Sequence, residues 1–76
     1  MKYLIVEIQV FSNGNMAQIT TTHPNRANAE QKFHEVLMYA ATSDVAVHSA
    51  VMLDETGRRI KGETYYHGAE EPTDAE

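Results

Sequence analysis

The pattern of hydrophobic and polar residues predicts four extended segments and one segment with a period near 3.6. In the first segment, 2–11, apolar side chains occupy both parities, with Leu4, Val6, Ile8 and Val10 on one and Tyr3, Ile5 and Phe11 on the other. A strand with one solvated face carries apolar residues on one parity only. The segment therefore predicts a strand that needs cover on both of its faces.

Segment 12–15 contains Asn13-Gly14, a dipeptide that suits the positive φ values of a tight hairpin turn. Segment 16–22 then returns antiparallel to the first strand. Its residues are small or β-branched and only weakly apolar, which is typical of a strand at the edge of a sheet. Pro24 ends the pairing, because proline has no N–H to donate.

A helix is predicted over 26–42, because apolar residues recur there at helical spacing. The repeating positions are Ala29, Phe33, Val36, Leu37 and Ala40. Asn25 precedes them and belongs to the residue types favoured at a helix N-cap.

Segments 45–54 and 58–67 predict two further strands, joined by a turn at 55–57 in which Gly57 supplies the unusual backbone conformation. The element order is β-β-α-β-β. We therefore predict an α+β fold, with a four-stranded antiparallel sheet and one helix packed on one of its faces.

One helix covers only one face, so we expect the other face to bind a second copy of the chain, as a dimer. The helix flank that carries Met38 and Tyr39 is the alternative contact. The predicted interface residues are Tyr3, Ile5, Phe11, Met38, Tyr39, His48 and Met52.

The length of 76 residues corresponds to one domain near the lower size limit, where folding buries only about 60% of the surface of the unfolded chain. Segment 68–76 has no large apolar residue and carries four carboxylates, which predicts an acidic, disordered tail. The predicted domain is therefore 1–67. So small a core strengthens the expectation of a homo-oligomer.

The net charge of −5 and the six Lys and Arg residues argue against nucleic-acid binding, which needs clustered cations. The chain has no cysteine, which fits a reducing cytosol. It also lacks a signal-peptide pattern and an apolar run of about 18 residues. We expect a cytoplasmic protein without membrane contact.

No motif indicates catalysis, a cofactor or a metal. His48 and Ser49 are adjacent on a strand and point to opposite faces, so they form no catalytic dyad. Glu7 and Glu63 form a carboxylate pair only if their strands are neighbours in register. The histidines at 23, 34, 48 and 67 lack the close spacing of a zinc motif. We expect no enzyme activity.

The last strand interleaves cations with aromatic residues, as surfaces that bind phosphates and bases do. Four of its side chains share one parity and are expected on one face, where they predict an anion or nucleotide site together with Arg58. The full predicted set is Arg58, Arg59, Lys61, Tyr65 and His67. The alternative is a solvated edge strand whose charges prevent aggregation between sheet edges.

Four segments carry a resemblance to a family: YLIVEIQ at 3–9, KFHEVL at 32–37, AATS at 40–43 and VHSAVML at 47–53. The pattern continues through Tyr66-His67 and resembles short uncharacterised proteins of Firmicutes phages and prophages. Similar sequences have a proline before the histidine of the third strand, where this chain has Ala46 and Val47. The resemblance implies a phage-encoded protein of the host cytoplasm and assigns no residue roles.

We expect a non-enzymatic binding protein, a host-takeover or anti-defence factor that binds a host protein or sequesters a nucleotide signal. The alternative is an accessory protein of virion assembly that docks through an apolar sheet face. A pocket with converging cations favours the first role, and a flat apolar patch favours the second.

Overall fold

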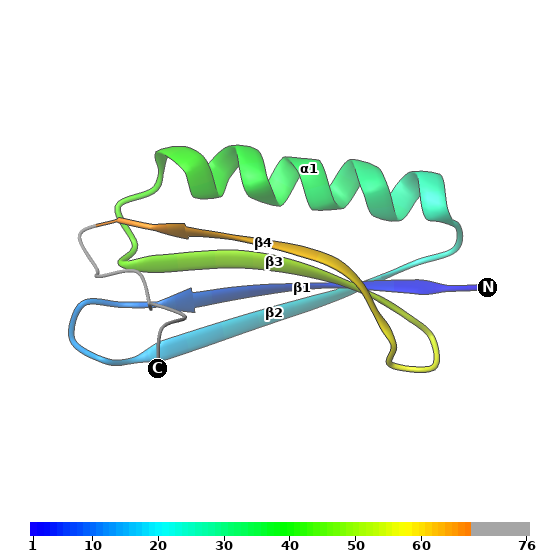
Figure 1. Ribbon diagram of the computed structural model, residues 1–76, viewed down its shortest axis with the longest axis horizontal. Coiled ribbons are helices and arrows are strands. Elements are labelled where there is room, and N and C mark those ends of the chain that lie inside the picture. Colours follow the sequence, from blue (N-terminus) through cyan, green and yellow to red (C-terminus); the bar gives the residue numbers. More distant parts are fainter. Residues whose placement is uncertain (68–76) are drawn as a thin grey trace, which may run out of the picture.

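The computed structural model describes residues 1–67 and has the element order β1 (Tyr3–Val10), β2 (Met16–His23), α1 (Arg26–Thr42), β3 (Val47–Asp54) and β4 (Arg59–Tyr66). The helix runs along one side of a four-stranded sheet (Figure 1). The predicted α+β fold and its β-β-α-β-β order are therefore confirmed, and α1 has the predicted bounds. The predicted tail, 68–76, lies outside the described residues.

The sheet has the strand order β2-β1-β3-β4, and each neighbouring pair is antiparallel. The central strand β1 pairs over its whole length with β2 on one side and with β3 on the other. The predicted position of the second strand at an edge is confirmed, and β4 forms the other edge.

The two hairpin turns each contain a glycine with positive φ, Gly14 and Gly57, both at +91°. This backbone conformation favours glycine because it lacks a Cβ atom. In the second turn, Asp54 Oδ1 accepts hydrogen bonds from the N–H groups of Thr56 (2.9 Å) and Arg58 (3.1 Å). The Thr56 hydroxyl also donates to it, and this bond is the main reason why the pKa of Asp54 lies below its usual value. Asp54 therefore fixes the β3–β4 turn as a carboxylate.

Both ends of α1 have a cap. The side chain of Asn25 accepts a hydrogen bond from the N–H of Asn28 (2.9 Å), which satisfies a donor that has no partner within the helix. The predicted N-cap is thus confirmed. At the other end, the N–H of Ser43 donates to the carbonyl of Ala40 (3.4 Å). The helix of the described segment lacks the length and apolar composition needed to cross a bilayer.

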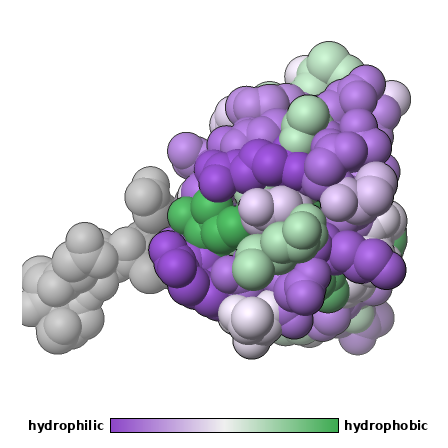
Figure 2. All heavy atoms as spheres, turned by 90° about the vertical axis from the view of Figure 1, so that its right-hand side faces the viewer, coloured by the Kyte–Doolittle hydropathy of each residue, from purple (hydrophilic) through white to green (hydrophobic). Residues whose placement is uncertain are grey.

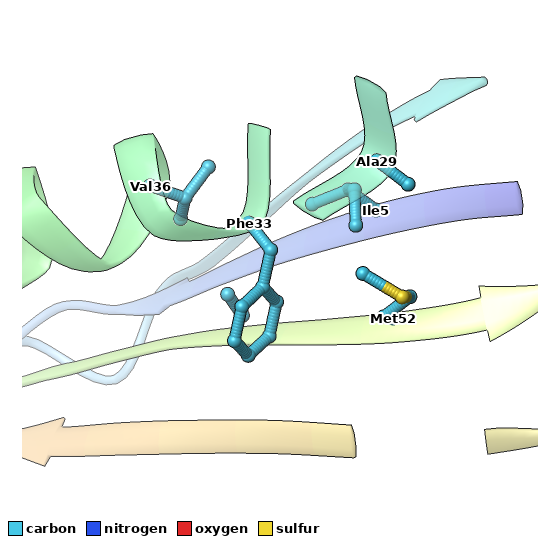
Figure 3. Packing of buried hydrophobic residues seen from close by; sticks show 6 residues of the cluster. Ile5, Ala29, Phe33, Val36 and Met52 are labelled. Atoms are coloured by element: carbon cyan, nitrogen blue, oxygen red, sulfur yellow. The ribbon is translucent and has the colours of Figure 1, made fainter. Parts of the chain in front are cut away.

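The core lies between α1 and the central strands. Its buried members are Ile5, Ala29, Phe33, Val36, Ala50 and Met52. Figure 3 shows Phe33 reaching from the helix toward the sheet, with Ile5 and Met52 beside each other below Ala29. Burying a side chain of the size of Phe33 contributes about 1.5–3 kcal/mol. Because the other helix residues of this core are alanine and valine, the helix lies close to the sheet but buries little area.

The predicted outward orientation of Ile5, His48 and Met52 is wrong. These side chains point toward α1 and are only 1%, 3% and 0% exposed. Glu7 shares the parity of Ile5, and a carboxylate on a strand ordinarily marks the solvated side. In the fold Glu7 faces the helix instead, because His48 provides a hydrogen-bond partner for it (2.6 Å). The aliphatic parity of β1 is consequently the one that the helix leaves uncovered.

Candidate functional site

The sheet face opposite α1 is lined by aliphatic side chains in both central strands. These residues are Leu4, Val6, Ile8 and Val10 in β1 and Val47, Val51 and Leu53 in β3. All seven are partly exposed. We call this surface, together with the side chains of β2 and β4 on the same side, the open face.

The margins of the open face are mostly polar and carry no carboxylate within the described strands. By register they are Met16, Gln18, Thr20 and Thr22 on β2 and Arg59, Gly62, Thr64 and Tyr66 on β4. Arg59 lies along this face, since a Cβ atom built on Gly62 would be 2.7 Å from Arg59 Nη2. The missing side chain of Gly62 leaves room for the guanidinium. A chain of net charge −5 thus has one sheet face whose described strands carry a cation and no acidic side chain.

The open face is large for so small a protein. Strands of eight residues are about 26 Å long, and four strands span about 19 Å, which gives roughly 500 Å². The largest apolar patch on a monomeric protein is typically about 300–600 Å² and is often functional. The aliphatic part lies on the two central strands and makes up about half of this face, roughly 250 Å², which approaches the lower end of that range.

The cations predicted to line one face of β4 point in different directions. A bulge between Met52 and Leu53 pairs Arg59 with Leu53 and Lys61 with Met52. Since residues opposite each other share a face, Arg59 lies on the open face and Lys61 on the helix side. The expectation that they share a face is wrong, because Ile60 is an extra residue in the bulge and packs against the core.

Lys61 is engaged in contacts within the fold. Its ammonium group donates to Glu30 on α1 and lies 4.9 Å from the centre of the Phe33 ring. The hydrogen bond with Lys61 is the largest cause of a lowered pKa at Glu30, with Arg26 adding to it. Lys61 therefore ties β4 to the helix, and a phosphate would have to compete with Glu30 for it.

Arg58 lies in the β3–β4 turn, where its side chain is exposed and its backbone bonds to Asp54. Figure 2 looks onto the end of the molecule that carries this turn and the N-terminus, and hydrophilic side chains cover most of the visible surface between smaller hydrophobic patches.

Tyr65 and His67 lie together at the other end of β4. Their rings are stacked with centroids 6.1 Å apart and planes inclined by 5°. His67 Nε2 donates to the carbonyl of Ala40 (2.6 Å), at the C-terminal end of α1. Tyr65 lies four positions after Lys61 along the strand, which is a distance of about 13 Å. The five predicted ligand-binding residues thus occupy a turn, two faces and two ends of one strand, and they form no common pocket.

A buried polar network was not expected from the sequence. His48 bonds through Nε2 to Glu7 Oε2 (2.6 Å) and through Nδ1 to Ser43 Oγ (3.0 Å), and Gln9 Nε2 donates to Glu7 (3.0 Å). Glu7 comes from β1, His48 from β3 and Ser43 from the end of α1. The network therefore joins the helix terminus to both central strands.

The order Ser43, His48 and Glu7 matches the composition of a hydrolase triad, but its surroundings do not suit that chemistry. Ser43 lies at the C-terminal end of α1, where the helix dipole is negative and disfavours an oxyanion. The His48 side chain is almost completely buried, so a substrate would have no access to its ring. The geometry favours a role in fixing the helix.

The other predicted positions are distributed over the surface. Met38 and Tyr39 are both 62% exposed on α1, and Phe11 is exposed at the β1–β2 turn. Tyr3 is partly buried against the core. Met38 and Tyr39 remain available for contacts, whereas the buried interface candidates require unfolding of the helix to become accessible.

No three His, Asp or Glu side chains within 1–67 converge on a site that could hold a metal ion. A hollow of about 330 Å³ lies beside the end of β2 and the polar flank of α1. It is lined by His23, Asn28, Gln31, Lys32 and Glu35. Lys32 and Glu35 pair with each other at 3.1 Å, so the hollow offers little net charge to a ligand.

Comparison with protein-family models, with curated proteins and with solved structures finds no match to this chain.

Proposed function

We propose that the chain is a non-enzymatic binding protein, encoded by a phage, that docks a protein partner on its open face. The observation that carries the proposal is the row of seven aliphatic side chains left uncovered in the two central strands. Burial of apolar surface is the main driving force of protein association, and a face without carboxylates adds no cost of desolvating negative charge.

The composition of the open face favours a protein over a nucleotide as the ligand. Nucleotide sequestration needs cations and aromatic rings that converge on phosphates and a base. Here Arg59 and Lys61 lie on opposite sides of the sheet, and Tyr65 stacks on His67. The two expected roles in phage biology, binding of a host protein and accessory docking in virion assembly, both use a protein surface of this kind.

Site-specific photo-crosslinking tests the proposal. A photoreactive amino acid replaces Val51, at the centre of the open face, or Gln31, which is exposed on the polar flank of α1. In infected host cells we expect one discrete heterologous product from position 51 and none from position 31. The product should disappear when Val6→Glu is added, since Val6 pairs directly with Val51 and a charge there opposes burial.

Equal crosslinking from both positions would overturn the proposal, as would a product insensitive to Val6→Glu in a folded variant. A product containing only two copies of the chain would identify self-association as the use of the open face. For nucleotides, we expect no thermal shift with mono-, di- or cyclic nucleotides. A shift that Lys61→Ala abolishes would support sequestration instead.

A further inference from the structure

The outer edge of β2 differs from most edge strands because residues 16–22 carry none of the usual protection, and only His23 and Pro24 close the strand at one end. Exposed edges are usually blunted by charged side chains, prolines or bulges, which prevent pairing with another strand. Residues 16–22 contain no charged residue and no proline, and β2 pairs with β1 over eight residues without a bulge. Within 1–67, no further strand lies beside it.

The opposite edge of the sheet, formed by β4, does carry features that prevent pairing with another strand. β4 carries Arg59, Lys61 and Glu63, and the bulge opposite Met52 and Leu53 interrupts its regular pairing. The two edges belong to one sheet and have equal length. The difference indicates that the outer edge of β2 pairs with another strand.

We propose that β2 pairs antiparallel with β2 of a second copy, about a two-fold axis perpendicular to the sheet. An isologous contact of this kind places each strand opposite itself, so its residues must be self-complementary. The uncharged sequence of residues 16–22 meets this condition, since it brings no like charges opposite each other. A chain of net charge −5 can approach its own copy along this edge without bringing the carboxylates of the edge strands together, since β2 has none.

Ile19 identifies the register. It points to the helix side of the sheet, opposite Glu7, and is 49% exposed. A two-fold axis between antiparallel strands passes through a pair formed by one residue and its own copy. If that residue is Ile19, two half-exposed isoleucines cover each other, and Gln18 faces Thr20 on the other side. This register buries the largest apolar side chain in the middle of the strand.

The resulting dimer has an eight-stranded sheet, with both helices on one side and the two open faces joined on the other. It occupies an edge and leaves the open face accessible. The dimer is therefore independent of the proposed docking of a partner, and it differs from the dimer expected from the sequence, which used a sheet face.

Cysteine crosslinking tests the register in a chain that has no native cysteine. Residues opposite each other in antiparallel strands have Cα atoms about 4.5–5.5 Å apart, within the range of about 4.4–6.8 Å that a disulfide spans. Under mild oxidation we expect Ile19→Cys to form a covalent dimer. Thr64→Cys, at an exposed position of the β4 edge, serves as the matched control and should stay mostly monomeric under denaturing conditions.

Light scattering tests the dimer without crosslinking. We expect the native chain to have the mass of two copies and Ile19→Lys to have the mass of one, because two lysines would face each other at the axis. Thr64→Lys should keep the dimer. Circular dichroism checks that each variant is folded, and Gln18→Lys replaces Ile19→Lys if the latter is not.

A native chain with the mass of one copy at all concentrations tested would overturn the proposal. A dimer that survives Ile19→Lys and Gln18→Lys, or one in which the Ile19→Cys variant does not crosslink, would overturn it too and place the contact elsewhere. The Val51 crosslink in a monomeric Ile19→Lys variant shows separately whether the open face binds its partner.

Discussion

The face of the sheet beneath α1 and the open face differ in the size and polarity of their side chains. Under the helix, the large apolar residues Ile5 and Met52 alternate with the small Ala50 and with Glu7 and His48, two polar residues that bond to each other. The open face has only aliphatic side chains in β1 and mostly aliphatic ones in β3. A helix needs close approach and satisfied polar groups, and a mixed face provides both. The more apolar face is the one that the helix does not cover, and it is the face on which we propose docking.

The largest expected effect compares neighbouring residues of β1 on the two faces. Ile5→Glu places a charge beneath the helix, where Ile5 is 1% exposed, and an unpaired buried charge costs several kcal/mol. We expect this variant to be unfolded, since the stability of a small domain is about 5 kcal/mol. Val6→Glu on the open face should fold. Circular dichroism and thermal melts compare the two, and an unfolded Val6→Glu with a folded Ile5→Glu would reverse the assignment of faces.

A milder version of this comparison uses adjacent residues of β3. Met52→Ala removes a fully buried side chain and should cost about 2–5 kcal/mol of unfolding free energy. Leu53→Ala, on the open face, should cost about 1 kcal/mol or less, because its side chain is partly exposed in the free protein. Urea denaturation measures both values. Equal losses would mean that the open face is already buried in the protein in solution.

The polar network beneath the helix should have an intermediate effect. His48→Ala removes the partner of Ser43 and one of the two partners of Glu7, and a polar group that loses its hydrogen bond in a largely buried position costs about 1–3 kcal/mol. A double-mutant cycle with Glu7→Gln measures how much of this loss arises from the pair. Purely additive losses would show that Glu7 and His48 do not interact.

The smallest effect is expected at the contact between α1 and β4. The pKa of Glu30 is lowered in the folded state, chiefly by its hydrogen bond with Lys61. A depressed carboxyl pKa adds stability above the unfolded value of 4.5, and this contribution is lost as the pH falls through the lower folded value. The native protein should therefore be more stable than Glu30→Gln at neutral pH, and this difference in stability should disappear in acid.

Thermal melts of both proteins between neutral and acidic pH measure this difference. The pKa of Asp54 is also lowered, so protonation of Asp54 in acid destabilises both proteins equally. The difference between the two melting temperatures therefore reports on Glu30 alone. A difference that does not change with pH would contradict the role assigned to the Lys61 contact.

The elements were predictable because their signals are local. The spacing of Ala29, Phe33, Val36 and Ala40 indicates the helix, and Gly14 and Gly57 mark the turns. The same local evidence indicated the edge position of the second strand. The apolar residues of the first strand also predicted uncovered apolar surface, but the residues expected to face outward, Ile5, His48 and Met52, are the buried ones.

The choice of face was not predictable, because it depends on partners that are far apart in sequence. The side chains of Glu7 and His48 are 41 residues apart, and only the pairing of β1 with β3 shows that they can bond. The bulge that places Arg59 and Lys61 on different faces was not predictable either, because it arises from the pairing of β4 with β3. Ser43 gave no signal beyond its position after the helix.

The attachment of α1 at both of its ends has a consequence for the thermodynamics of recognition. Ser43 and the Ala40 carbonyl hold the C-terminal end through His48 and His67, and Glu30 holds the N-terminal half through Lys61. Because the helix is fixed against the sheet in this way, the sheet should lose little conformational entropy when a partner protein binds to it. Affinity on such a stiff platform should be governed mainly by how fast the complex comes apart.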